Sequence, residues 1–118
     1  MWALAAEVVF KTIFGRSSPD PAYVQYHVYE FQLLHGGPHR WSFPSGTAII
    51  SAAIVAVLWP LIGRWRRLGA LVVFALSVAV VVTNYHWLSD VIAGVFLGVS
   101  IGWFTVRLLY PMRFNADK

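Results

Sequence analysis

His86 and Asp90 are the two side chains in this sequence whose types and spacing are best suited to chemistry. They are four residues apart, and on a helix this spacing places two side chains on the same face. A carboxylate that accepts a hydrogen bond from one imidazole nitrogen fixes the tautomer and leaves the other nitrogen free as a nucleophile or base. The alternative is an interfacial histidine beside an acidic residue that complements a helix dipole. The long apolar segment that follows favours a functional pair, because ionisable groups are costly in a membrane helix.

A second candidate is the predicted helix start at Pro44, Ser45, Gly46 and Thr47. The first N–H groups of a helix have no intrahelical acceptor, and a glycine lets a ligand approach the backbone closely. A helix start of this kind can bind a phosphate oxygen. Taken alone, however, the pattern favours a simple helix start with Ser45 as its N-cap.

Lys11 and Arg16 are the third candidates, near the end of the first apolar segment. Both side chains could neutralise a phosphate, and arginine can do so with two parallel hydrogen bonds. For either residue considered singly, a long cationic side chain that reaches the lipid headgroups is an equally good explanation.

The composition of the chain indicates an integral membrane protein. Of 118 residues, 58% are hydrophobic and 12% are charged, whereas an average soluble domain has about 25% charged residues. The absence of cysteine excludes disulfides, thiolate metal sites and cysteine nucleophiles. The net charge of +4 does not predict a nucleic-acid partner, because the cations flank apolar segments and form no single basic patch. We therefore expect membrane phospholipids as neighbours.

Three long apolar segments with few or no charged residues predict helices that cross the membrane. They extend approximately over Ser45–Gly63, Leu68–Val82 and Leu88–Tyr110, and a bilayer core requires about 17 to 20 apolar helical residues. The segment Trp2–Phe14 is too short to cross alone, and we interpret it as the end of a longer helix. The sequence thus predicts about four helices, with a polar loop without regular structure between the first and second, over residues 16–43.

The basic link between the second and third predicted spans sets the expected orientation. It contains Arg64, Arg66 and Arg67, and such links face the cytoplasm. By alternation, Lys11, Ser45 and His86 then lie near the opposite side. We therefore expect a multi-pass protein of the plasma or inner membrane whose candidate site faces the extracytoplasmic side.

Three segments of the chain resemble, in order, the signature segments of the type 2 phosphatidic acid phosphatases, the PAP2 superfamily that also contains the vanadium haloperoxidases. They are Lys11–Pro19, Ser42–Thr47 and His86–Gly94. The resemblance implies an all-α membrane bundle and a single PAP2-like domain over residues 1–118. Membrane members of the family look like six-helix proteins whose last four helices hold the site. The short first helix is consistent with a chain that lacks the N-terminal helices of that architecture.

The resemblance also implies roles for individual residues. His86 would attack phosphorus to form a phosphohistidine, and Asp90 would orient it. No metal and no cofactor are expected, and the implied partner is a lipid phosphate substrate. The residues expected to bind the substrate phosphate are Lys11, Arg16, Ser45, Gly46 and Thr47.

Three positions depart from the family's pattern. Ser18 stands where the family has arginine, Thr47 where it has the general-acid histidine, and Ala79–Val80 where it has Ser-Arg. Threonine cannot act as an acid near neutral pH, so His35, His39 and water stay open as proton sources. One electrostatic donor is worth about 10²–10³ in rate. The chain is therefore either a variant with a rearranged site or a weakened or inactive relative.

Two functions follow from these observations. The first is a membrane phosphatase that hydrolyses a lipid-linked phosphomonoester or diphosphate through a phosphohistidine intermediate. The alternative is a catalytically inactive PAP2-like membrane protein that binds phospholipid headgroups or has a structural role. The sequence leaves the substrate headgroup, the lipid chain and the oligomeric state open.

Overall fold

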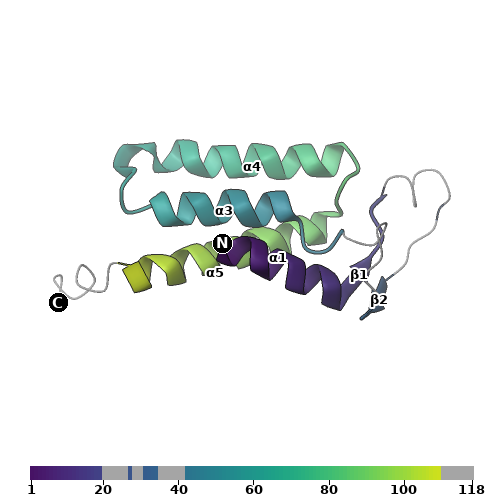
Figure 1. The fold of residues 1–118 in the computed structure, drawn as a ribbon. Coiled ribbons are helices and arrows are strands. Elements are labelled where there is room, and N and C mark those ends of the chain that lie inside the picture. Colours follow the sequence, from purple (N-terminus) through teal and green to yellow (C-terminus); the bar gives the residue numbers. More distant parts are fainter. Residues whose placement is uncertain (20–26, 28–30, 35–41, 110–118) are drawn as a thin grey trace.

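The computed structural model describes residues 1–19, 27, 31–34 and 42–109. This part of the chain is mostly helical, as predicted. Figure 1 shows α3 and α4 side by side, with α5 and α1 packed against α3. The helices are α1 (Trp2–Ile13), α3 (Gly46–Leu58), α4 (Arg66–Val82) and α5 (Leu88–Leu109), and a short 3₁₀ helix, η2 (Gly63–Trp65), leads into α4.

Helix α5 packs along α3 through small residues. A Cβ atom on Gly94 would lie only 2.7 Å from the backbone oxygen of Ser45, and one on Gly98 would overlap the backbone oxygen of Ile49. Glycine and alanine permit such close helix packing because no side chain separates the backbones. We call this contact the glycine seam; it comprises Gly94, Gly98 and Gly102 on α5 and Ala48, Ala52, Ala53 and Ala56 on α3.

The glycine seam ends at Asp90, which precedes Gly94 by four residues and therefore lies on the same face of α5. The backbone N–H of Ser45 donates to the backbone oxygen of Asp90 over 3.0 Å. The close approach of the two helices thus sets the register between the start of α3 and the start of α5. This register brings the segments Ser42–Thr47 and His86–Gly94 together.

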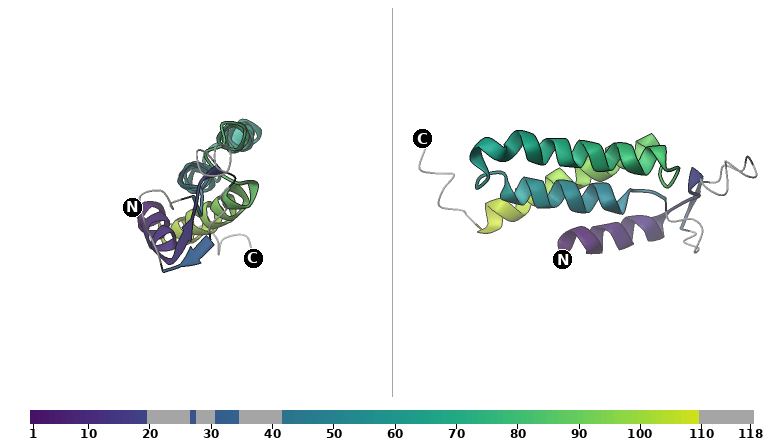
Figure 2. Two further views of the ribbon diagram at one scale, coloured as in Figure 1. Left: turned by 90° about the vertical axis from the view of Figure 1, so that its right-hand side faces the viewer. Right: turned by 90° about the horizontal axis from the view of Figure 1, so that it is seen from above.

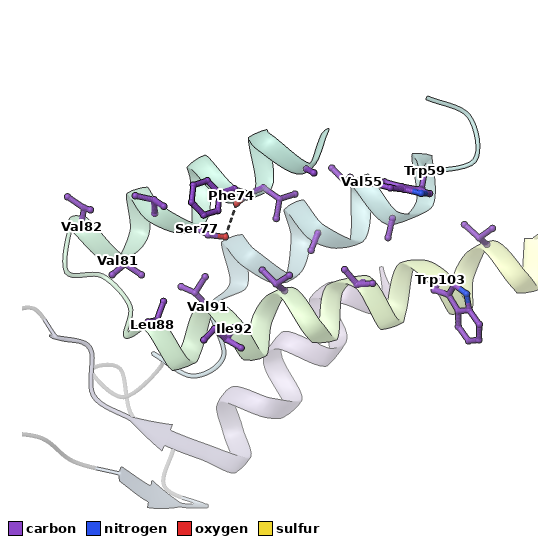
Figure 3. Close-up of a pocket in the computed structure, with 18 of the residues that line it drawn as sticks. Val55, Trp59, Phe74, Ser77, Val81, Val82, Leu88, Val91, Ile92 and Trp103 are labelled. Atoms are coloured by element: carbon purple, nitrogen blue, oxygen red, sulfur yellow. Dashed lines mark hydrogen bonds between the residues drawn. The ribbon is translucent and has the colours of Figure 1, made fainter. Parts of the chain in front are cut away.

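Helix α4 packs much less closely than α5. None of its residues is buried, and its main helical neighbour is α3. Between α3, α4 and α5 lies an open groove of about 820 Å³, lined almost wholly by apolar side chains. We call it the apolar groove; Figure 3 shows Val55, Phe74, Val81, Leu88, Val91 and Trp103 among its lining residues.

Two segments of the described residues are long and apolar enough to cross a membrane, Gly63–Val82 and Leu88–Leu109. The predicted extent of the last helix is therefore confirmed. The prediction of a spanning helix over Ser45–Gly63 is wrong, because α3 has 13 residues and is only about 20 Å long. Pro60 explains its early end, since proline has no backbone N–H to donate to the oxygen of the residue four positions earlier.

The segment between α1 and α3 contains a small sheet that the sequence did not predict. Strand β1 (Phe14–Arg16) pairs antiparallel with β2 (Phe31–Leu33), with Gly15 opposite Gln32. Figures 1 and 2 show this sheet at the end of the bundle where α1 ends, α3 begins and α4 turns into α5. The all-α expectation thus holds for the helical bundle and is wrong for this segment, where β1 fixes the position of Arg16.

Candidate active site

Asp90 is the centre of a hydrogen-bond network that joins three distant parts of the chain. Its carboxylate is fully buried. Oδ1 accepts from the guanidinium of Arg16 over 2.5 Å, and Oδ2 accepts from the hydroxyl of Ser42 over 2.5 Å and from the backbone N–H of Trp87 over 2.9 Å. A buried carboxylate is costly unless it is paired and hydrogen-bonded. These bonds therefore stabilise both the charge and the arrangement of the three segments.

The bond from Trp87 also shows why α5 begins where it does. Asp90 is the third residue of this helix, and a carboxylate at that position can accept from the N–H of the residue that precedes the helix. The expected interaction of Asp90 with the start of a helix is thus present. The network adds Arg16 and Ser42 to it, so the residue does more than cap α5.

His86 lies before α5 and is oriented by a backbone carbonyl. Its Nδ1 is 2.8 Å from the backbone oxygen of Ser42 and 4.0 Å from Oδ2 of Asp90. Because a carbonyl oxygen can only accept, Nδ1 carries the proton and Nε2 of the neutral ring keeps its lone pair. The sequence predicted this division of roles with Asp90 as the acceptor. The acceptor is different because His86 precedes the helix and so does not share a helical face with Asp90.

Burial lowers the pKa of His86 below its ordinary value of 6.5. The hydrogen bond to Ser42 and the charge of Asp90 act in the opposite direction, and Lys11 lowers the pKa while Glu7 raises it. The imidazole is therefore neutral at pH 7, which is the state in which Nε2 is nucleophilic. The influence of Lys11 and Glu7 also indicates that α1 contributes charges to the surroundings of His86.

The start of α3 supplies unpaired N–H groups, although not all of those expected. The hydroxyl of Ser45 caps the helix by accepting from the N–H of Ala48 over 3.4 Å, and the N–H of Ser45 is bound to Asp90. The expectation that the Ser45 backbone binds phosphate therefore does not fit the structure. The N–H groups of Gly46 and Thr47 donate to no acceptor among the described residues and remain available to an anion.

The two predicted cations have different surroundings. Nζ of Lys11 forms an ion pair with Oε1 of Glu7 over 2.6 Å, and both side chains are partly exposed. Arg16 is more buried, and its guanidinium donates to Ser89 over 2.7 Å as well as to Asp90. This geometry makes Arg16 a support for Asp90. Its predicted contact with a substrate phosphate stays a prediction.

Ser42, Trp87 and Ser89 are site residues that the sequence did not single out. Trp87 links the site to the residue that follows β1, because its Nε1 donates to the backbone oxygen of Ser17 over 3.0 Å. The sequence did contain a sign of this role, because Trp87 is next to His86 in the segment His86–Gly94 that resembles the family's third signature. The predicted proton sources His35 and His39 lie outside the described residues. Within the part of the chain that is described, no cluster of three side chains could hold a metal ion.

The fold and this network together define a class of protein: a helical bundle with a histidine–carboxylate site at one end. The family model of the PAP2 superfamily matches residues 1–113, and the chain therefore belongs to that superfamily. Its members are typically phosphatases, so membership suggests a phosphatase-type function. Together with the two long apolar helices, membership also fits a membrane protein. No curated protein and no solved structure gives a significant match to this chain.

Proposed function

We propose that this protein is a membrane phosphatase that hydrolyses a lipid-linked phosphomonoester or diphosphate through a phosphohistidine intermediate. The observation that carries the proposal is the 2.8 Å contact between Nδ1 of His86 and the backbone oxygen of Ser42. It supports a proton on Nδ1, which would leave Nε2 as the nucleophile. The low pKa of His86 supports the same role.

In the proposed reaction, Nε2 of His86 attacks phosphorus and the bond between phosphorus and the leaving oxygen breaks. The ring then carries a positive charge, and the carboxylate of Asp90, 4.0 Å from Nδ1, stabilises it. Lys11 and the N–H groups of Gly46 and Thr47 would bind the phosphoryl oxygens. Water then attacks phosphorus, the P–N bond breaks, and inorganic phosphate leaves.

The apolar groove supports a substrate that carries a lipid chain. It is largely free of polar lining, and its size of about 820 Å³ is within the range of ligand-binding pockets. Leu88 and Val91, which line it, flank Asp90 on α5 (Figure 3). We propose that the chain of the substrate lies in this groove while its phosphate meets His86 at the extracytoplasmic surface.

A second candidate is a catalytically inactive member that binds phospholipid headgroups or has a structural role. Two observations favour it. Lys11 is already paired with Glu7, and Thr47 cannot replace the general-acid histidine of the family.

The test is phosphate release by the purified protein in detergent from a panel of lipid phosphates, with His86→Ala measured in parallel. We expect release by the wild-type protein and none above background by the variant. Release that persists unchanged in His86→Ala would exclude His86 as the nucleophile. No release from any substrate in the panel would favour the inactive member.

A further inference from the structure

Glu7 places a carboxylate against the helix start at which the phosphate is proposed to bind. It lies on α1, one turn before Lys11. A Cβ atom on Gly46 would lie 2.5 Å from Cδ and 2.8 Å from Oε2 of Glu7, so the carboxylate covers the Cα atom of Gly46. The neighbour of Gly46 is Thr47, which holds the position of the family's general acid.

The simplest explanation of this contact is electrostatic. A carboxylate is stabilised at a helix N-terminus, and Lys11 provides a counter-charge. Two further observations point beyond it. The charge of Glu7 raises the pKa of His86, so the two groups lie within electrostatic range of each other. In addition, Oε2 accepts no hydrogen bond from the described residues, so this oxygen is available to contact a substrate oxygen.

The proposed reaction requires a proton donor when the leaving group is an alkoxide. An alkoxide is a poor leaving group in water, and a positioned acid lowers the barrier by protonating its oxygen. Thr47 cannot supply this proton near neutral pH. We propose that Glu7 does so, as the proton-transfer residue of the site. This inference rests on the proposed phosphatase function.

A single proton on Glu7 is sufficient to balance both steps of the proposed reaction. In the first step, Nε2 of His86 forms the P–N bond, the P–O bond breaks, and the carboxyl proton of Glu7 passes to the leaving oxygen, which departs as an alcohol. In the second step, the carboxylate of Glu7 takes a proton from water as its oxygen attacks phosphorus. The P–N bond breaks, and neutral His86, protonated Glu7 and phosphate result.

The ion pair with Lys11 explains how Glu7 could acquire its proton at the right time. An incoming phosphoryl dianion competes with the carboxylate for Nζ of Lys11. It also brings a second negative charge beside Glu7, and like charges favour the protonated form of a carboxyl group. In the proposed complex the phosphoryl group would therefore replace Glu7 as the partner of Lys11.

The dependence on the leaving group tests this role. Glu7→Gln keeps the shape of the side chain and an oxygen for Lys11, but an amide cannot donate a proton as an acid. A long-chain alkyl phosphate needs protonation of its leaving oxygen, whereas 4-nitrophenyl phosphate does not. We expect Glu7→Gln to lower kcat for the alkyl phosphate by about 10²–10⁴, and to change kcat for 4-nitrophenyl phosphate far less.

Lys11→Met is the matched comparison on the same helix. It should slow both substrates alike, because both must bind a phosphoryl group. The thermal unfolding midpoint of Glu7→Gln in detergent should equal that of the wild-type protein, which separates a loss of chemistry from a loss of fold.

Other outcomes would overturn the role of Glu7. An equal loss on both substrates would show that Glu7 only positions Lys11, and unchanged or raised activity on both would show that it is only a counter-charge. Failure of the proposed function has a different signature: the wild-type protein would release phosphate from neither substrate, and the role of Glu7 would then be excluded with it.

Discussion

The two sides of α5 are packed in different ways. On one side the glycine seam leaves no space between α5 and α3, and this contact ends in the buried network of Asp90. On the other side, the open apolar groove lies between α5 and α4. The two kinds of packing suit different roles. Close packing holds a carboxylate and its partners in fixed positions, and the loosely packed side leaves room for an apolar ligand.

The largest effect on stability is expected from a substitution of Asp90, at the end of the glycine seam. Asp90→Ala leaves the guanidinium of Arg16 without its buried counter-charge, and loss of one partner of a buried ion pair costs about 3–5 kcal/mol. Thermal and denaturant unfolding in detergent should show this loss together with the loss of phosphatase activity. The double variant Arg16→Met with Asp90→Leu should recover much of the stability and none of the activity. An Asp90→Ala variant as stable as the wild-type protein would show that the ion pair of Arg16 and Asp90 does not stabilise this end of the bundle.

The second largest effect on stability is expected from Gly98, in the middle of the glycine seam. Gly98→Ala places a Cβ atom on the backbone oxygen of Ile49, and backbone cannot move aside as a side chain can. Overpacking of this kind costs about 1–3 kcal/mol, and the shift should also misalign Asp90. Gly69→Ala is the control, because its Cβ would meet only side-chain methyl groups, of Val55 at 3.1 Å and of Ile62 at 3.4 Å. Equal unfolding midpoints for the two variants would contradict the distinction between the seam and the rest of the bundle.

A smaller effect is expected from filling the groove. Val95 lines it and Phe96 does not, although both are on α5. Val95→Trp should reduce kcat/KM for a long-chain lipid phosphate by roughly tenfold, the scale of a few lost apolar contacts, and should spare a short-chain analogue. Phe96→Trp should affect neither substrate. If Val95→Trp slows both substrates equally, the groove does not hold the lipid chain.

The smallest effect concerns pH. Burial lowers the pKa of His86 in the folded protein, whereas the unfolded chain keeps a value of about 6.5. As the pH falls below 6.5, the unfolded chain binds a proton at His86 before the folded protein does, and this favours unfolding. The contribution of neutral His86 to the free energy of unfolding is therefore fully present above pH 6.5 and is lost as the pH falls towards the lower pKa of the folded state. The acid limb of kcat/KM should likewise lie below pH 6.5. His86→Gln should remove this part of the pH dependence of unfolding, and an acid limb above pH 6.5 would exclude a neutral, buried His86.

Hydrophobic segments and turn residues predicted most of the bundle. The long apolar segment after His86 predicted α5 nearly to its last residue, because length and apolarity decide such a helix. The end of α3 was missed even though Pro60 was visible, since the apolar residues around it continue the pattern. The spacing of Gly94, Gly98 and Gly102 by four, in phase with Asp90, was a readable sign of close packing.

The site was harder to predict than the helices because much of it depends on the backbone and on contacts between distant segments. Ser42 orients His86 through a carbonyl oxygen, which every residue type has. Glu7 reaches Gly46 only because α1 lies against α3. Arg16 could be predicted as a cation near the site. Its role as the partner of Asp90 follows from strand β1, whose residues show no clear strand pattern.

The central claim is that Nε2 of His86 accepts the phosphoryl group, and trapping of the intermediate tests it most directly. A lipid phosphate labelled with ³²P would be mixed with the protein in detergent, quenched in alkali within the first turnover, and the labelled residue identified by peptide mapping. A phosphohistidine is stable in alkali and labile in acid. We predict an acid-labile label on His86 that is absent from His86→Ala. Turnover without any labelled protein, or a label on another residue, would contradict the mechanism.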